Sequence, residues 1–258
     1  MPSLKVMTFN IRGSFVKDGV NVWPNRRGLA LRVIRDQAPD LIGFQEVQEG
    51  NWSFFAEALP DYERRRGPRY NNAEPFCYPS ILWRGEALEA LEEGGFWLSE
   101  TPEVFSASWE TACIRSALWI RFRLRGSGRE FVHLNTHLDH ESETARVNGA
   151  RLVLERLAEV GGDLPRLVTA DFNCEPGAPV HGLFLQAGLQ DAHLRAKGRD
   201  GPLTFTFHEF TGQRAWGRID WVLCSRQVEV RACRIVTDAE PPVYPSDHFP
   251  VVAELALR

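Results

Sequence analysis

Short apolar runs, rich in β-branched and aromatic residues, recur along the chain and constrain its fold more than any other feature. Runs of this kind predict buried strands. They are LKVMTFNI, LIGFQEV, SILWR, GGFWLS, SALWIRFRL, EFVHLNTHL, RLVTADFN, RIDWVLCS, VEVRACRIV and PVVAELAL. Several follow one another with no helical segment between them, so we expect a strand-rich α/β sandwich rather than a Rossmann fold.

Few segments show the helical period. The clearest is SETARVNGARLVLERLAEVGG, where Ser142 is placed to cap the helix. NRRGLALRVIRDQAPD predicts a helix capped by Asn25, residues 51–59 predict a short helix, and APVHGLFLQAG predicts one that stops at Gly188. Residues 61–79 are rich in Arg, Asn and Pro, and we expect a long loop there.

The size and composition of the chain are those of an ordinary globular protein. It has 258 residues, of which 43% are hydrophobic and 25% charged. This length suits one large domain or two small ones, and because no linker or low-complexity tract interrupts the chain, we expect one domain over residues 1–258. The net charge of −4 argues against binding to nucleic acid or an anionic membrane by bulk charge, although it leaves room for local basic patches.

The cysteines and the N-terminus bear on location. Five cysteines are present, an odd number without a C-x-x-C pair, so neither a zinc site nor a disulfide framework is indicated. The chain starts MPSLKVMTFN, without the apolar stretch of a signal peptide, and no window has the length of a transmembrane helix. We therefore expect a cytoplasmic compartment, no membrane association, and a monomer with no evident protein partner.

One of the strand-like runs, EFVHLNTHLDH, carries a polar face. Side chains alternate along a strand, so one face presents His133, Asn135, His137 and Asp139. Taken alone, this pattern is most simply explained by a half-exposed strand with a wet face. The other predicted strands change that interpretation.

Polar side chains stand at the ends of most of those strands. Because loops at one end of a sheet bring such residues together, a shared site is expected. Asn and Asp are also common turn residues, so ADFN alone is more often a turn. Asp220 is harder to explain in that way, because it lies in an apolar run and needs a buried partner. The set comprises Asn10, Glu46, His137, Asp139, Asp171, Asn173, Asp220, Asp247 and His248.

This set of side chains indicates a class of chemistry. The oxygen ligands suit a hard cation such as Mg²⁺ or Mn²⁺, as one ion or two, and the histidines suit an acid, a base or an electrostatic clamp. A hard cation beside histidines and acids is what phosphoester hydrolysis requires, because charge must be neutralised and water activated.

Six motifs occur in a recognisable order, TFNIRG, FQEV, NTHLDH, ADFN, GRIDWVL and SDHFPV. In this order they resemble the endonuclease/exonuclease/phosphatase superfamily, over nearly the whole chain. The resemblance implies a four-layer α/β/β/α sandwich of the deoxyribonuclease I type, with the site at one end of the two sheets. It implies divalent-metal-dependent phosphoester hydrolysis, and Arg12 in place of an acid favours the deoxyribonuclease and nocturnin branches over exonuclease III.

The resemblance also implies roles for individual residues at the metal site and the water. Glu46 matches the principal metal ligand, Asn10 supports it, and Asp247 is expected to complete the metal site. Asp171 matches the carboxylate that orients or deprotonates the attacking water, and Asn173 matches a ligand of a phosphate oxygen.

Three further residues match the histidine machinery. Asp220 matches the carboxylate that pairs with His248, which would contact the scissile phosphate. His137 matches a second catalytic histidine, a candidate proton donor to the leaving group. We expect Asn135 and Asp139 to support His137, and His133, deeper in the strand, to be structural.

Substrate contacts are less clearly marked. Arg12 is a candidate phosphate contact or a solvated loop arginine, and Glu74 is a candidate acid to support His137, although EPFCYPSIL departs from the family pattern. Arg115, expected near the site, Asp139, within NTHLDH, and His208, in a segment that flanks a motif, are further candidates.

The substrate class stays open at this point. The run YERRRGPRYNN mixes guanidinium and aromatic groups, as in single-stranded nucleic-acid sites, and is also what a solvated loop would contain. A small phosphodiester or phosphomonoester or a single-stranded nucleic-acid end is expected, with a 3′–5′ exoribonuclease or an endonuclease as the alternative. A catalytically inactive phosphate-binding module and a plain sheet scaffold are the alternatives of another class.

Overall fold

The computed structural model describes residues 3–71, 73–196 and 204–258. Their core is two six-stranded sheets that pack face to face. The first sheet has the order β11-β12-β1-β2-β4-β3, and the second the order β5-β6-β7-β8-β10-β9. The strands of the first sheet are β1 (Ser3–Asn10), β2 (Leu41–Val47), β3 (Tyr62–Arg66), β4 (Tyr78–Arg84), β11 (Val228–Ile235) and β12 (Val251–Leu257). Those of the second are β5 (Leu88–Trp97), β6 (Ser116–Leu124), β7 (Arg129–His137), β8 (Arg166–Asp171), β9 (Leu189–Asp191) and β10 (Asp220–Ser225).

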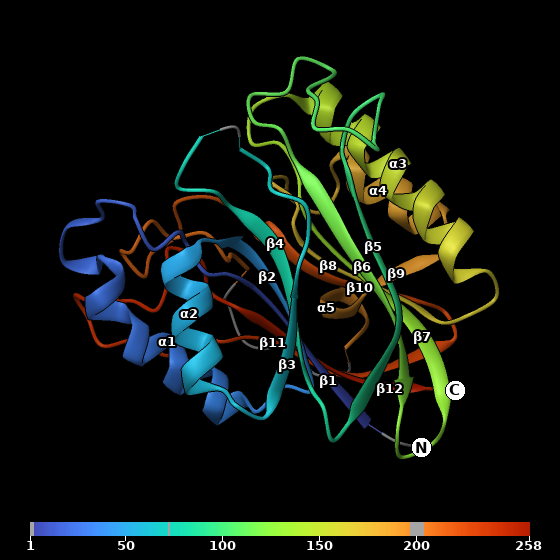
Figure 1. The fold of residues 1–258 in the computed structure, drawn as a ribbon, viewed down its shortest axis with the longest axis horizontal. Helices are drawn as coiled ribbons and strands as arrows, with labels where there is room; N and C mark the ends of the chain where they lie inside the picture. The colour runs from blue at the N-terminus through green and yellow to red at the C-terminus, as the bar shows by residue number, and fades with distance from the viewer. Residues whose placement is uncertain (1–2, 72, 197–203) are drawn as a thin grey trace.

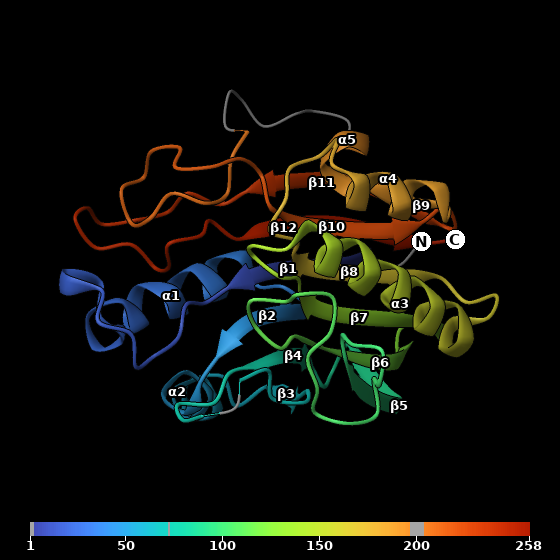
Figure 2. The same ribbon diagram turned by 90° about the horizontal axis from the view of Figure 1, so that it is seen from above.

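Helices cover the outer face of each sheet (Figure 1). The first sheet carries α1 (Trp23–Gln37) and α2 (Glu49–Ala58), and the second carries α3 (Glu143–Gly161) and α4 (Pro179–Gln186). A short helix, α5 (Ala192–Arg195), and a 3₁₀ turn, η1 (Gly19–Asn21), complete the described elements. Figure 2 shows the stacked layers from above. The expected α/β/β/α sandwich of the deoxyribonuclease I type is therefore confirmed.

Three apolar clusters hold the layers together, one at each interface between layers. Phe9, Val33 and Phe44 belong to the cluster between the first sheet and its helices, while Leu134 and Val153 belong to the cluster between the second sheet and α3. The third cluster fills the space between the two sheets. None of the helices in the described parts of the chain has the length and apolar character needed to cross a membrane.

The polar face of β7 lies inside the sandwich, so the interpretation of a wet face is wrong. Asn135 is fully buried; its amide donates to the Phe44 and Ser80 carbonyls of the facing sheet, and its oxygen accepts from Gln45 at 2.7 Å. The two sheets approach closely here: a Cβ atom added to Gly43 would lie only 2.0 Å from Thr169 Oγ1, so only glycine fits at this position.

His133 belongs to the same interior polar cluster. Its Nε2 lies 2.7 Å from Thr169 Oγ1, and the Thr169 hydroxyl in turn donates to Asn135. The side chain is fully buried and does not line the cleft at the ends of the strands. This placement agrees with the structural role expected for it.

Two local predictions need correction. Residues 61–79 are not one long loop, because Tyr62–Arg66 forms the edge strand β3, antiparallel to β4. Charged side chains are tolerated on an edge strand, where one face and one edge meet solvent. Asn25 does not cap α1: the helix begins at Trp23, and the Asn25 amide donates to the Val20 carbonyl.

Other local predictions are confirmed. Ser142 caps α3, since its hydroxyl accepts from the backbone N–H of Ala145. SALWIRFRL and EFVHLNTHL form the expected hairpin β6–β7. Gly188 adopts a left-handed conformation at φ 85° just after α4.

Strand register explains why the polar residues meet. β1 and β2 run parallel, so Asn10 and Glu46 end at the same edge of the first sheet. β7 and β8 are also parallel, and His137 is the register partner of Asp171. Asp171 is in turn paired with Asp220 on β10.

Candidate active site

A cleft of about 620 Å³ opens where these strands end. Seven of the predicted site residues line it, namely Glu46, His137, Asp171, Asn173, Asp247, His248 and Arg12, together with Arg115 from the predicted substrate contacts. Asn10 and Asp220 lie beneath it, at 1% and 0% exposure, and bond to residues that line it. Nine residues from distant motifs thus form one cluster, and Arg115 lines the same cleft.

Asn10 joins the two halves of the cleft. Its Nδ2 donates to Glu46 Oε1 at 3.1 Å and to Asp171 Oδ2 at 3.0 Å. Its Oδ1 accepts from the backbone N–H of Arg12 at 3.1 Å. A buried amide that bridges two carboxylates fixes their separation, so Asn10 couples the first sheet to the second.

Backbone strain accompanies the site. Arg12, Glu46 and Asn173 all have positive φ angles, of 56°, 61° and 48°. Non-glycine residues adopt this conformation at a cost, of order 1–3 kcal/mol each, and it persists where the surroundings enforce it. At Glu46 it coincides with an irregularity in the pairing of β2 with β4, which turns the carboxylate into the cleft.

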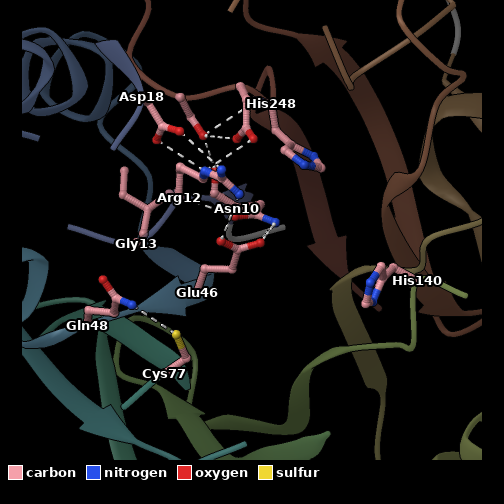
Figure 3. Close-up of polar contacts among 12 residues, drawn as sticks. Asn10, Arg12, Gly13, Asp18, Glu46, Gln48, Cys77, His140 and His248 are labelled. Atoms are coloured by element: carbon pink, nitrogen blue, oxygen red, sulfur yellow. Dashed lines mark hydrogen bonds and ion pairs between the residues drawn. The ribbon is translucent and has the colours of Figure 1, made fainter. Parts of the chain in front are cut away.

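The Arg12 guanidinium lies among three carboxylates, as Figure 3 shows for Asp18 and Glu46. It donates to both oxygens of Asp18, at 3.1 and 3.2 Å. It also lies 3.6 Å from Asp247 Oδ2 and 3.9 Å from Glu46 Oε2. Burial opposes its charge, but the Asp18 hydrogen bonds and the charges of Asp247 and Glu46 outweigh that effect and raise the pKa of Arg12.

His248 is held by Asp220 on one side and faces Asp171 on the other. Its Nδ1 lies 2.9 Å from Asp220 Oδ2, and its Nε2 lies 3.8 Å from Asp171 Oδ2. Burial disfavours a charged imidazole, yet the negative charges of Asp220 and Asp171 raise the pKa of His248. Burial and the Asp220 charge likewise raise the pKa of Asp171.

His137 is in a different state. The Asn173 amide donates to its Nε2 at 2.9 Å, and that nitrogen lies 3.2 Å from Asp171 Oδ2. Burial, followed by the positive charges of Arg115 and His248, holds the pKa of His137 well below its usual value. This shift opposes the proton-donor role that the sequence implied.

Arg26, which the sequence did not single out, holds the two loops that carry the site. It is fully buried and donates five hydrogen bonds to backbone carbonyls, which belong to Ile11, Arg12, Gly13, Asn21 and Pro245. The first three follow β1, and Pro245 precedes Asp247. Arg26 therefore positions the metal-ligand candidates of both loops without contacting the cleft.

Asp139, His208 and Glu74, three of the predicted substrate contacts, do not line the cleft. Asp139 accepts from the backbone N–H groups of Cys113, Glu141 and Ser142, so its carboxylate stabilises the start of α3. His208 is fully buried, with its ring 3.9 Å from that of Phe249.

Glu74 lies on an exposed loop and lines a neighbouring groove. It does not support His137, whose Nδ1 has no hydrogen-bond partner in the described parts of the chain. Instead the Tyr70 ring meets His137 edge-on, with centroids 6.0 Å apart. The Tyr70 hydroxyl accepts from the backbone N–H of Glu46 at 2.5 Å.

Tyr70, Asp18 and Arg26 were missed because none of them belongs to a motif, and Tyr70 and Arg26 act through contacts between distant segments. Tyr70 belongs to the arginine-rich run YERRRGPRYNN, which contains none of the six motifs, so nothing in its neighbourhood indicated a role in the site. Asp18 follows TFNIRG by a few residues, so its closeness to Arg12 in sequence was the one available hint.

Two oxygen-rich groups could hold a cation. Asp171, Asp220 and His248 offer ligand atoms within 4.8 Å of one another, but Asp220 and His248 are already hydrogen-bonded to each other. Glu46 and Asp247 instead share a cation, the Arg12 guanidinium, which shows that their carboxylates converge on one positive charge. Oxygen ligands of this kind fit a hard divalent ion.

Known structures are similar to this chain in fold and, at about 30% identity, in sequence. A mannosyl-6-phosphatase from Bacteroides thetaiotaomicron is 31% identical, covering 98% of this chain and 100% of that one, with a TM-score of 0.92. An endonuclease/exonuclease/phosphatase from Bacteroides vulgatus is 29% identical over 100% of both chains, with a TM-score of 0.91.

More distant relatives are longer proteins. Nocturnin of Drosophila melanogaster is 26% identical over 65% of this chain, which spans only 26% of the Nocturnin length. The profile of the Endonuclease/Exonuclease/phosphatase family matches residues 7–248. Together with the geometry of the cleft, this match shows that the chain belongs to the endonuclease/exonuclease/phosphatase family.

Proposed function

We propose that this protein is a Mg²⁺- or Mn²⁺-dependent hydrolase of small phosphomonoesters or phosphodiesters, acting by attack of water on phosphorus. The observation that carries the proposal is the position of Asp171 Oδ2. It lies 3.0 Å from Asn10 Nδ2, 3.2 Å from His137 Nε2 and 3.8 Å from His248 Nε2. One carboxylate oxygen at the cleft is thus fixed by an amide and lies beside two imidazoles, where it is placed to orient a water and accept its proton.

The protein groups then have separate tasks. Asp171 would hold the water and take its proton, which its raised pKa favours. His248, kept charged by Asp220, would contact the phosphate and stabilise the charge that develops there. Asn173 would give a hydrogen bond to a phosphate oxygen by exchanging its contact with His137.

Glu46 and Asp247 would hold the divalent ion, with Asn10 fixing the Glu46 carboxylate. When bound, the ion supplies positive charge that neutralises phosphate oxygens and lowers the pKa of water. We propose one ion, because the second oxygen-rich group is engaged in the Asp220–His248 pair. Arg12 would contact the phosphate beside the ion.

Two observations support a small substrate. The similar mannosyl-6-phosphatase is named for a phosphorylated sugar. The arginine-rich segment is also occupied: Arg65 pairs with Glu93 at 2.6 Å and Arg66 with Glu49 at 2.8 Å. The other two arginines of that segment, Arg64 and Arg69, lie over the rings of Trp52, Phe76 and Phe105.

The second candidate is a nuclease that acts on a single-stranded end. The similarity to Nocturnin and to the 3′–5′-exoribonuclease subunit Ccr4 of Aspergillus niger, 22% identical over 66% of this chain, favours it. The test is a screen of phosphomonoesters, phosphodiesters, short RNA and short DNA, each with Mg²⁺, with Mn²⁺ and with chelator. Hydrolysis of no phosphoester under any of these conditions would refute the proposal.

A further inference from the structure

A second cavity, of about 530 Å³, lies next to the catalytic cleft, and no step of the proposed reaction uses it. We call it the aromatic groove. Its volume is within the usual range for small-molecule sites. The groove is lined by Phe15, Glu49, Glu74, Pro75, Phe76 and Tyr78.

The groove and the cleft share a wall. Cys77 lines the cleft, whereas its neighbours Phe76 and Tyr78 line the groove. Gln48 ties this wall together, since its amide donates to Cys77 Sγ at 3.3 Å and its oxygen accepts from the backbone N–H of Phe15 at 2.8 Å. In Figure 3, Gln48 and Cys77 lie on the opposite side of Glu46 from Asp18.

Aromatic surface in the groove is exposed and held in place. Phe15 is 59% exposed, so most of its ring surface is open to a ligand in the groove. Arg69 lies 4.6 Å from the centroid of the Phe76 ring, and Arg66 lies 5.2 Å from that of Tyr78. Guanidinium groups over these rings fix their orientation.

The two charged residues that line the groove are Glu49 and Glu74, and the Arg66 that lies over Tyr78 is paired with Glu49. Glu49 accepts from Arg66 and Ser53, and although its slight burial acts to raise its pKa, these hydrogen bonds lower it, so Glu49 is ionised. Glu74 is exposed, and no residue in the described ranges engages its carboxylate. Carboxylates accept hydrogen bonds from hydroxyl groups, whereas they repel a second phosphate.

We propose that the aromatic groove binds the sugar ring of a phosphorylated saccharide whose phosphate lies in the catalytic cleft. This proposal rests on the proposed function. Aromatic rings would pack against the apolar face of the ring, and Glu74 would accept from its hydroxyls. A polynucleotide would instead bring further phosphates toward the Glu74 carboxylate.

The test compares binding of mannose 6-phosphate and inorganic phosphate by calorimetry, with Mg²⁺ present. The wild type should bind the sugar phosphate at least about tenfold more tightly. Phe15→Ala and Glu74→Gln should each reduce that preference about fivefold, the scale of one aromatic or hydrogen-bonded contact. Phe105→Ala is the matched control, since Phe105 also lies beside Arg69 but is outside the groove lining. Its preference should equal that of the wild type.

Kinetics with mannose 6-phosphate and methyl phosphate separate this proposal from the proposed function. Phe15→Ala should raise KM only for the sugar phosphate. The groove proposal would be overturned if all variants kept the wild-type preference for mannose 6-phosphate over inorganic phosphate. It would also be overturned if Phe15→Ala raised KM more for adenosine monophosphate than for mannose 6-phosphate. Binding preference without hydrolysis of any phosphoester would reject the proposed function and keep the groove.

Discussion

His248 and Asp220 form a hydrogen-bonded pair that links the two sheets at the catalytic cleft, with 2.9 Å between His248 Nδ1 and Asp220 Oδ2. Asp220 begins β10 of the second sheet, and His248 lies just before β12 of the first. A carboxylate at Nδ1 stabilises the imidazolium and directs Nε2 to the cleft. The pair therefore depends on the packing of the two sheets.

Removal of divalent metal should abolish hydrolysis. The motivation is the convergence of Glu46 and Asp247 on one positive charge. The measurement is turnover of bis(p-nitrophenyl) phosphate after dialysis against chelator, followed by addition of Mg²⁺ or Mn²⁺. Full activity in excess chelator would contradict the metal assignment.

His248→Ala and Asp171→Ala should each lower kcat by at least roughly 10²-fold, the lower scale for a lost acid–base or electrostatic group. His248→Ala should also lower the melting temperature, because it leaves the buried Asp220 carboxylate without its partner. Asp171→Ala should lower it less, because it removes one of three neighbouring buried charges. Steady-state kinetics and thermal unfolding check both statements. A well-folded His248→Ala variant with wild-type kcat would exclude its contact with the phosphate in the transition state.

His133→Gln should change the acid stability of the protein more than its rate. Burial lowers the pKa of His133 from 6.5 to about 3. Between these values the unfolded chain binds the proton and the folded one does not, so stability falls as the pH drops below about 6.5. In the variant, this contribution to the pH dependence of the free energy of unfolding, up to about 1.4 kcal/mol per pH unit, should disappear.

Urea unfolding between about pH 4 and 6 measures that slope. His140→Gln serves as the control, because the His140 side chain is 45% exposed. An unchanged slope in His133→Gln, or loss of turnover in a well-folded variant, would contradict the structural role.

Arg26→Gln should destabilise the protein by about 3 kcal/mol or more, because several buried carbonyls lose their donor. Turnover should fall as well, because Arg26 joins the loop that follows Asn10 to the loop that precedes Asp247, and the substitution removes that connection. Urea unfolding and steady-state kinetics are the measurements. Arg27→Gln is the control, because Arg27 is exposed on α1. Equal effects of the two substitutions would argue against a role for the hydrogen bonds from Arg26 to the backbone carbonyls.

Salt should affect catalysis only weakly. A protein with 6–10 phosphate contacts loses roughly 10³–10⁵ in affinity between about 50 and 200 mM salt, and this cleft offers few free cations, so kcat/KM should fall by no more than roughly tenfold. The comparison uses a supercoiled plasmid, a short single-stranded RNA and a small phosphodiester. Efficient plasmid nicking with a steep salt dependence would move the protein to the endonucleases.

The sequence by itself determined most of the strands, most helices and about half of the residues that line the cleft, including its acid and histidine candidates. Apolar runs report the local preference of the backbone and the burial of one segment, so β7 and α3 could be predicted without their neighbours. The order of six motifs indicated which polar strand ends belong together. Asn10, Glu46 and Asp171 were therefore expected at one site before any register was known.

Only the tertiary structure decided which polar side chains line the cleft and which hold the surrounding backbone in place. Asp139 follows His137 closely in sequence, yet it bonds backbone N–H groups at the start of α3, while Asn135 bonds the facing sheet. Asp18 and Arg26 had no motif, because their partners are set by loop conformation and sheet packing. Contacts of this kind depend on register and on the approach of two layers, which no local pattern of side chains encodes.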